Sequence, residues 1–272
     1  MTTRVLTKEE VQTYQTDGVA WIPHALDHDW VDRLCDVAET QMADPSQWAN
    51  DTNPGASRNR MFSDRYLWRS NTTIYEFIRD SGFAGLAAQA MDSASARFYF
   101  DHLFVKQPGT DNPTPWHQDA PYWPFRGRKI CSIWLALTAT NVASSSLEFI
   151  RGSQREYIHY LPKSFVEGDK DSWVADSTEG KEVPDIESNR DDFDIVGFEL
   201  EPGDALIFSA WVLHGARSNL SVQDPRLALS TRWLGDDVTW DPREGTDPTV
   251  TSDMVCVNPG DRIIDNAIFP EF

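Results

Sequence analysis

Apolar residues recur at helical spacing in the first third of the chain. Thr7 begins a capping-box pattern that predicts a helix over residues 7–17, and the apolar residues 19–23 then predict a short strand. Asp27 or Asp29 can cap a second helix, whose apolar residues fall on one face. The chain is therefore expected to open with a helix, a strand and a helix.

Residues 44–91 change character twice. Residues 44–65 are rich in Asn, Asp, Ser, Pro, Gly and Arg, a composition that favours loop over regular structure. Apolar residues return at helical spacing over 73–91, where Gly82 and Gly85 predict a break into two pieces. We expect this region to complete a helical N-terminal portion of about 95 residues.

Strand character dominates from residue 96 onward. Short runs of aromatic, β-branched and apolar residues are separated by turns that contain proline and glycine, a pattern typical of a sandwich or barrel. The sequence thus predicts a mainly β protein with flanking helices (α+β), its barrel spanning about 96–236. The expected strands are residues 96–106, 129–140, 146–150, 195–200, 205–208 and 226–234.

Two polar stretches interrupt or follow the strands. Residues 163–195 form an acidic insert with glycines and a proline, and so long a connection is usually either disordered or a functional lid. The tail from Val238 is rich in Asp, Pro and Thr and is expected to wrap the surface. Without internal repeats or low-complexity tracts, we expect residues 1–272 to form a single domain.

Composition restricts the partners. With 40% hydrophobic residues, eleven tryptophans and fourteen phenylalanines, the chain reads as globular rather than disordered. A formal net charge of −19 opposes binding to nucleic acid or to an anionic membrane surface. Nucleic acid and membranes are therefore not expected as partners, and the sequence leaves open whether the protein is a monomer or a homodimer.

Three cysteines, odd in number and far apart, make neither a disulfide framework nor a closely spaced zinc motif. We expect Cys35, Cys131 and Cys256 to be reduced, buried thiols. The N-terminus lacks the apolar run of a signal peptide, and no stretch approaches the length of a membrane span. The cytoplasm is therefore the expected location.

The segment from Trp116 to Pro124 carries the residues of greatest chemical interest. If it runs as a strand, His117 and Asp119 point to the same face, because side chains alternate along a strand. An imidazole and a carboxylate, completed by a distant second histidine, suit non-haem Fe(II) with positions left open. With six histidines and 43 acidic residues, one such pair also arises by chance, so a hydrogen-bonded core pair is the alternative.

Two later residues are further candidates. His214 follows a strand that begins after a tight Pro-Gly-Asp turn, and it would complete a three-residue metal site. Arg226 begins an alternating strand, where a guanidinium pointing into an apolar barrel needs an anionic partner such as a carboxylate co-substrate. The alternatives are a hydrogen-bonded structural histidine and an arginine that is paired with one of the many acidic residues.

Taken in this order, the motifs resemble those of the phytanoyl-CoA dioxygenase-like Fe(II)/2-oxoglutarate-dependent oxygenases. The resemblance covers most of the chain and implies a double-stranded β-helix, a jelly-roll (cupin-like) barrel with N-terminal helices packed on it. The motifs that carry it are the helix-Gly-strand-helix opening, Trp-His-Gln-Asp at 116–119 with residues 122–125, the strand with Trp134, residues 147–153, and His214 with Arg226.

The resemblance also implies a site and its cofactors, which are Fe(II), 2-oxoglutarate and O2. The catalytic metal ligands would be His117, Asp119 and His214. Arg226 would bind the distal carboxylate of 2-oxoglutarate. Weaker candidates for co-substrate contacts are Ser230, Trp134, Gln107 and His102, and for Trp134 a simple core role is the alternative.

Two departures from the family pattern are visible. Relatives usually carry Pro-Gly-Ser-His where this chain reads Arg151-Gly152-Ser153-Gln154, so the last histidine is missing. It lies outside the expected metal ligands and alters only the rim of the site. One additional residue also stands between His214 and Arg226, which makes the arginine assignment less secure than the ligand assignment.

The implied activity is that of a dioxygenase that hydroxylates an unactivated C–H bond of a small metabolite and releases succinate and CO2. Related halogenases have a small residue where this chain has Asp119, so the carboxylate favours hydroxylation or another oxygen-derived outcome, such as desaturation or cyclisation. The alternatives are a jelly-roll metal-binding protein without oxygenase activity, and a hydrolase or isomerase that uses a zinc-bound water.

The primary substrate is poorly specified by the sequence. Aromatic and basic residues follow the ligand segment and could line the mouth of a pocket, although a structural aromatic turn with solvent-facing arginines is an equal alternative. These residues are Tyr122, Trp123, Phe125, Arg126 and Arg128. A coenzyme A thioester is not expected, because a strongly acidic chain is an awkward partner for that polyanion.

Overall fold

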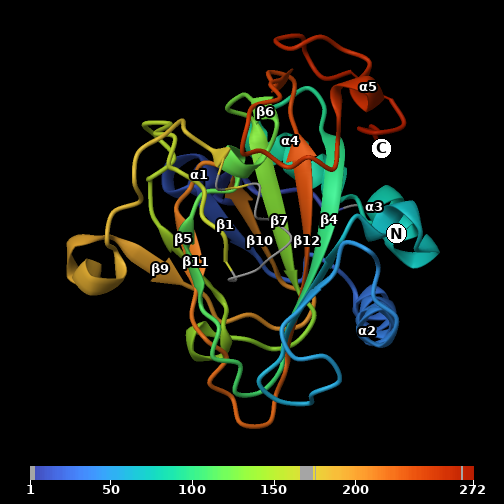
Figure 1. The fold of residues 1–272 in the computed structure, drawn as a ribbon, viewed down its shortest axis with the longest axis vertical. Coiled ribbons are helices and arrows are strands. Elements are labelled where there is room, and N and C mark those ends of the chain that lie inside the picture. The colour runs from blue at the N-terminus through green and yellow to red at the C-terminus, as the bar shows by residue number, and fades with distance from the viewer. Residues whose placement is uncertain (1–3, 166–173, 175, 265) are drawn as a thin grey trace.

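The computed structural model describes residues 4–165, 174, 176–264 and 266–272. Two antiparallel sheets face each other, a seven-stranded sheet in the order β1-β10-β7-β12-β4-β3-β2 and a four-stranded sheet in the order β5-β11-β8-β9 (Figure 1). A short pair, β13-β6, lies near one end. The expected jelly-roll barrel with N-terminal helices is confirmed.

The bounds of the strands are β1 Val19–Ile22, β2 Asn50–Asp51, β3 Met61–Arg65, β4 Arg97–Lys106, β5 Thr114–His117, β6 Phe125–Arg126, β7 Ile130–Ala136, β8 Leu147–Ile150, β9 Ile195–Gly197, β10 Ala205–Ser209, β11 His214–Ala216, β12 Arg226–Leu234 and β13 Thr239–Trp240. The α-helices are α1 Lys8–Asp17, α2 His28–Ala43, α3 Thr72–Asp80, α4 Phe83–Met91 and α5 Ser252–Val255. Short 3₁₀ turns are η1 Leu67–Arg69, η2 Ala120–Tyr122, η3 Val142–Ser144 and η5 Glu187–Asp192.

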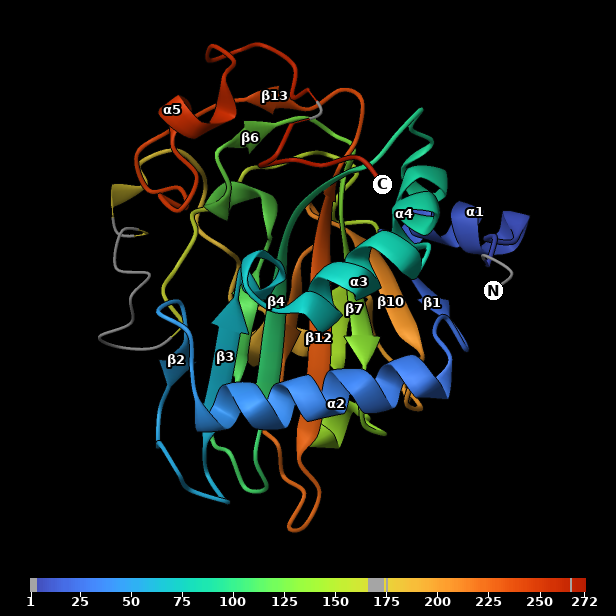
Figure 2. The same ribbon diagram turned by 90° about the vertical axis from the view of Figure 1, so that its right-hand side faces the viewer.

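The helices α2 and α3 lie across the outer face of the larger sheet (Figure 2). Their apolar side chains pack with alternate residues of the central strand β12, such as Leu229 and Trp233, in the largest core cluster. The intervening residues of β12 face the smaller sheet, where Trp134, Phe149 and Phe208 form a second cluster. The alternation along β12 therefore separates a structural core from the barrel interior.

The predicted helix limits agree closely with the structure. Thr7 caps α1 through a capping box, and Gly18 ends the helix with a φ of 85°. The carboxylate of Asp27 caps α2 by accepting a hydrogen bond from the Trp30 backbone N–H. The helical stretch near residue 80 breaks into α3 and α4 at Gly82, whose φ of 80° no helix interior allows.

Part of the expected loop over residues 44–65 is wrong. Its last five residues form β3, which pairs with β4, and Phe62 is fully buried. The sequence pattern missed this strand because it contains polar side chains. One of them, Asp64, is buried and accepts hydrogen bonds from Ser46 and Gln41. A satisfied buried carboxylate is compatible with a sheet interior, although it breaks the apolar pattern by which strands are recognised.

The C-terminal tail does more than wrap the surface. Trp240, Val255 and Phe269 are fully buried, and they pack with Tyr99 and Phe125 in a third core cluster. Figure 1 shows this red segment, with α5, at the end of the barrel beside β6. The tail therefore closes one end of the barrel.

The cysteine expectation holds only in part. Cys131 is buried and Cys35 is half-buried, whereas Cys256 is exposed, so its predicted burial is wrong. All three are free thiols. Among the described residues, no helix combines the length and the apolar character needed to cross a bilayer.

Gly203 offers a test of the packing between α2 and the larger sheet. Its φ is 94°, and an added Cβ would lie 2.6 Å from the carbonyl oxygen of Leu26. Gly55 has a similar φ of 79° with open space around it. We expect Gly55→Ala to lower the free energy of unfolding by about 1–2 kcal/mol through backbone strain alone. Gly203→Ala should lower the free energy of unfolding by about 1–3 kcal/mol more than Gly55→Ala does, because the added methyl group overpacks the turn.

Urea unfolding followed by circular dichroism measures both variants. Equal losses of unfolding free energy would show that the turn at Gly203 relaxes freely, contrary to the contact with Leu26.

Candidate active site

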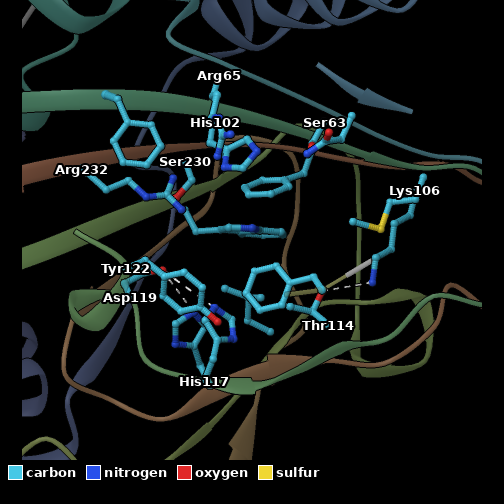
Figure 3. Close-up of a pocket in the computed structure, with 18 of the residues that line it drawn as sticks. Ser63, Arg65, His102, Lys106, Thr114, His117, Asp119, Tyr122, Ser230 and Arg232 are labelled. Carbon is cyan, nitrogen blue, oxygen red and sulfur yellow. Dashed lines mark hydrogen bonds and ion pairs between the residues drawn. The ribbon is translucent and has the colours of Figure 1, made fainter. Parts of the chain in front are cut away.

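One cavity opens between the two sheets, with about 1200 Å³ of empty space including its mouth (Figure 3). Its walls come from β3, β4 and β12 on one side and from β5 and β11 on the other. Of the residues expected from the sequence, it gathers His117, Asp119, His214, Arg226, Trp134, Ser230 and His102.

The two histidines are brought together by strand pairing. His117 ends β5 and His214 begins β11, and the two residues are direct antiparallel partners. Their ring centroids lie 4.2 Å apart. The Nδ1 atoms face the carbonyls of Pro115 at 2.8 Å and Val212 at 3.1 Å. Each Nε2 is therefore left available to a metal, because a hydrogen bond from Nδ1–H to a carbonyl commonly orients a metal-binding imidazole.

The carboxylate of Asp119 completes the cluster. Its Oδ1 lies 3.9 Å from the Nε2 of both His117 and His214, and one ligand atom from each of the three residues lies within 4.8 Å of the others. All three side chains are buried. Two imidazoles and one carboxylate on one face of an open cavity are the donor set that suits non-haem Fe(II).

The route by which Asp119 reaches the cluster differs from the expectation. The strand β5 ends at His117, and Asp119 has helical angles, φ −73° and ψ −44°, at the start of η2. Gln118 faces away from the cavity, where its Nε2 donates to the carbonyl of Trp211 at 2.7 Å. The prediction that His117 and Asp119 lie close together was right, but the reason given for it, alternation along a strand, was wrong. A turn after His117 brings the two side chains together.

Burial sets the charge states of the ligands. Desolvation, helped by the neighbouring His214, lowers the pKa of His117 to about 3, and desolvation also lowers the pKa of His214. Burial disfavours the carboxylate of Asp119, but the nearby Arg232 and the two imidazoles outweigh it and lower its pKa. At neutral pH the site thus holds neutral imidazoles and an ionised carboxylate, the forms that bind metal.

Ser132 supports the carboxylate ligand. Its hydroxyl, on β7, donates to Oδ2 of Asp119 at 2.6 Å and leaves Oδ1 facing the histidines. We expect Ser132→Ala to weaken Fe(II) binding about 10- to 100-fold, because outer hydrogen bonds orient the ligands. Anaerobic calorimetric titration with Fe(II) measures this affinity.

Ser146→Ala is a matched control, since the Ser146 hydroxyl is buried and has no hydrogen-bond partner in the described part of the chain. An equal loss of Fe(II) affinity in both variants would mean that Ser132 acts only through general stability.

Arg226 begins β12 beside Lys106, its partner in register on β4. It is 4% exposed, and its Nε and Nη1 have no hydrogen-bond partner among the described residues. Burial lowers the pKa of Arg226 to about 10, so the guanidinium stays charged at neutral pH. A charge buried in this way calls for an anionic partner in the cavity.

Of the four weaker candidates for co-substrate contacts, three line the cavity and one does not. Trp134 lies 5.8 Å from the Arg226 guanidinium, and the Ser230 hydroxyl is buried without a hydrogen-bond partner among the described residues. His102 also lines the cavity. Gln107 does not line it, and its amide points to the sulfur of Met42 at 3.8 Å.

The aromatic turn after the ligand segment contributes only in part. Tyr122 and Trp123 line the cavity, whereas Phe125 is buried in the cluster closed by the tail. Arg126 pairs with Glu179 and Asp241, and Arg128 lies over the ring of Tyr157. The expected pair of mouth arginines thus lies outside the cavity lining.

Sequence reasoning missed several lining residues, which are Arg65, Lys106, Phe165, Arg232 and Asp247. A usable pattern existed for Arg232, which stands an even number of residues after Arg226 and Ser230 on one strand. Arg65 and Asp247 lie in segments that the composition marks as loop or tail. Long-range contacts alone bring these two residues to the cavity.

The model of the phytanoyl-CoA dioxygenase (PhyH) family matches residues 14–228. The chain belongs to this family. A probable phytanoyl-CoA dioxygenase of Caenorhabditis elegans is 24% identical over 173 residues, covering 61% of this chain and 52% of that protein. Dioxygenase lolE1 of Epichloe uncinata is 24% identical over 221 residues, covering 79% of this chain and 78% of that protein. The chain thus spans about half the length of the first relative.

Solved structures share the fold. The carbocyclase SnoK from nogalamycin biosynthesis, described as non-heme and alpha ketoglutarate dependent, has a TM-score of 0.75 at 19% identity and covers 100% of this chain and 98% of its own. The epimerase SnoN, solved with Fe3+, alpha ketoglutarate and nogalamycin RO, has a TM-score of 0.71 at 20% identity, with 97% of each chain covered. EctD from S. alaskensis, solved with 2-oxoglutarate and 5-hydroxyectoine, has a TM-score of 0.69 at 16% identity, covering 93% and 84%.

Proposed function

We propose that this family member is an Fe(II)- and 2-oxoglutarate-dependent oxygenase that oxidises a C–H bond of a small metabolite. The observation that carries the proposal is the pairing of two features in one cavity. A cluster of two histidines and one aspartate can hold the metal, and the buried, unsatisfied guanidinium of Arg226 can hold a carboxylate. The solved neighbours support the same pairing, since SnoN is described with Fe3+ and alpha ketoglutarate and EctD with 2-oxoglutarate.

Different residues of the cavity would bind the metal and the co-substrate. His117, Asp119 and His214 would hold Fe(II), and Arg226 would bind the distal carboxylate of 2-oxoglutarate beside Trp134. Iron with 2-oxoglutarate and O2 supplies the oxidising power, with succinate and CO2 as co-products. The protein positions the substrate and keeps water away from the metal, for which the aromatic rings of Tyr122 and Phe165 are placed next to His117.

Within this chemistry we propose hydroxylation as the outcome. The carboxylate of Asp119 at the third ligand position argues against halogenation and is compatible with hydroxylation and with other oxidative outcomes. Neighbours described as a carbocyclase and an epimerase make cyclisation or epimerisation the competing outcomes. Mass spectrometry of the product separates them, because hydroxylation adds one oxygen atom, cyclisation by dehydrogenation removes two hydrogens, and epimerisation leaves the mass unchanged.

The test of the function is anaerobic addition of Fe(II) and then 2-oxoglutarate to metal-free protein. We expect a visible charge-transfer band, and in air the release of succinate that candidate metabolites stimulate. A colourless mixture that forms no succinate with any candidate would contradict the proposal and favour a metal-binding barrel without activity.

The lid expected at residues 163–195 stays a proposal, because 166–173 and 175 lie outside the described residues. It is supported by Lys163, Ser164 and Phe165, which line the cavity, and by the Phe165 ring, whose centroid lies 4.6 Å from that of His117. If the segment covers bound substrate, proteolysis within it slows when iron, 2-oxoglutarate and substrate are present.

A further inference from the structure

Arg232 is a second buried arginine in the cavity, and the proposed chemistry does not use it. It is 6% exposed, and its Nε and Nη1 have no hydrogen-bond partner in the described part of the chain. Figure 3 shows its side chain above Asp119 and Tyr122, next to Ser230 and His102. Burying a guanidinium whose N–H donors have no hydrogen-bond acceptor lowers the stability of the fold unless a ligand accepts those hydrogen bonds.

Three aromatic rings hold the guanidinium of Arg232 in place. Its central carbon lies 5.0 Å from the ring of Phe100 and 6.0 Å from those of Phe104 and Trp123. Contacts with ring faces stabilise a cation without using its N–H donors. The planar fork is therefore positioned in advance and remains free to bind a planar oxyanion with two hydrogen bonds.

Arg232 and Arg226 serve different ends of the cavity. They lie on the same strand, six residues apart, which corresponds to about 20 Å along β12. The charge of Arg226 acts on Lys106, whereas the charge of Arg232 acts on Asp119. In Figure 3, Lys106 and Arg232 lie at opposite sides of the cavity. If Arg226 takes the distal carboxylate of 2-oxoglutarate, Arg232 is left for a different anion close to the metal ligands.

The charge of the cavity lining contrasts with that of the whole chain. The chain carries a net charge of −19, yet the described lining residues include three arginines and two lysines against only two carboxylates. One of those carboxylates, Asp119, is a proposed metal ligand. The other, Asp247, accepts hydrogen bonds from the hydroxyls of Tyr66 and Tyr99. A basic cavity in an acidic protein selects anions locally.

We infer that Arg232 binds a carboxylate of the primary substrate, which is therefore a small organic acid with an apolar body. This inference rests on the proposed function. The apolar body is indicated by the rings of Phe100, Phe104 and Trp123, which line the cavity beside the Arg232 guanidinium. Arg232 then acts as a residue that determines specificity, because a neutral analogue leaves its buried donors without a partner.

The experiment compares an acid with its matched neutral amide. Protein loaded anaerobically with Fe(II) and 2-oxoglutarate is titrated by calorimetry with phenylacetate and phenylacetamide, and with the pair 3-phenylpropionate and 3-phenylpropionamide. We expect the wild type to prefer the acid about 10- to 100-fold, the range for a hydrogen bond to a charged group. Arg232→Met should abolish this preference, Arg232→Lys should retain part of it, and both variants should bind 2-oxoglutarate as tightly as the wild type.

Three results would overturn the role of Arg232. The wild type could show no preference for either acid, or Arg232→Met could leave the preference intact. Alternatively, Arg232→Met and Arg232→Lys could weaken 2-oxoglutarate or Fe(II) binding and leave the acid-to-amide ratio unchanged, which would assign Arg232 to the co-substrate or to Asp119. The charge-transfer band of the wild type reports separately on the proposed function, so a band without acid preference refutes only this inference. Acid preference without a band refutes only the function.

Discussion

Replacement of His214 by alanine is expected to weaken Fe(II) binding by more than about 100-fold and to abolish succinate formation. The imidazole is one of three buried ligands, and the direct loss of a ligand exceeds the 10- to 100-fold loss typical of its outer hydrogen bonds. The affinity is measured by anaerobic calorimetry, and the site by the charge-transfer band.

His28→Ala is the matched control, because His28 is exposed in the first turn of α2, far from the cavity lining. It should leave Fe(II) affinity and the band unchanged. If His214→Ala keeps both while its circular dichroism matches the wild type, the metal does not lie at this cluster and the proposed function fails.

Replacement of Arg226 by alanine should raise the dissociation constant of 2-oxoglutarate by about 30-fold or more while Fe(II) still binds. Truncation of one partner of a buried charged pair typically costs 2–5 kcal/mol, and each 1.4 kcal/mol is a factor of ten. Arg226 is buried, and the charged groups that act most strongly on Asp119 are Arg232 and the two histidines, so the loss of Arg226 should affect 2-oxoglutarate more than metal binding. Titration of the charge-transfer band with 2-oxoglutarate measures the shift.

Two further variants sharpen the result for Arg226. Arg226→Lys keeps the charge but loses the two-pronged donor face, so its dissociation constant should fall between those of the wild type and the alanine variant. Arg126→Ala removes a half-exposed arginine that pairs with Glu179 outside the cavity, and it should bind 2-oxoglutarate normally. An unchanged affinity in Arg226→Ala would show that the co-substrate uses another cation, with Lys106 and Arg232 the first to test.

Local patterns predicted the helical elements well, and they also singled out the three residues that the structure gathers in one candidate metal cluster. Thr7 and Asp27 cap their helices through contacts that span only a few residues, so the sequence alone contains the information. His117 was singled out by its spacing from Asp119 and His214 by its place after a strand that follows a tight turn, and the family resemblance supplied their partnership. Their direct pairing follows from the antiparallel register of β5 and β11.

The remaining features depend on contacts between distant segments. The strand β3 was not recognised because Asp64 is polar although it is buried. The hydrogen-bond donors to Asp64 come from α2 and from the loop after it. Lys106 was passed over because nothing local distinguishes a cation that faces a cavity from one that faces solvent, whereas the even spacing of Arg232 from Arg226 on one strand could have identified Arg232. The polar composition of the tail from Val238 likewise predicts a surface segment, although a few large residues such as Trp240 and Phe269 are buried in a core.

Both imidazoles, on the paired strands β5 and β11, are anchored to carbonyls two residues earlier in the chain, and this has a consequence for metal removal. His117 and His214 are oriented by Pro115 and Val212, and these strands are held by the sheet rather than by an ion. Extraction with a chelator should therefore leave a folded apoprotein that regains iron without refolding, unlike small zinc domains that unfold when stripped. Added iron would then raise the melting temperature only by mass action, to an extent set by its free concentration.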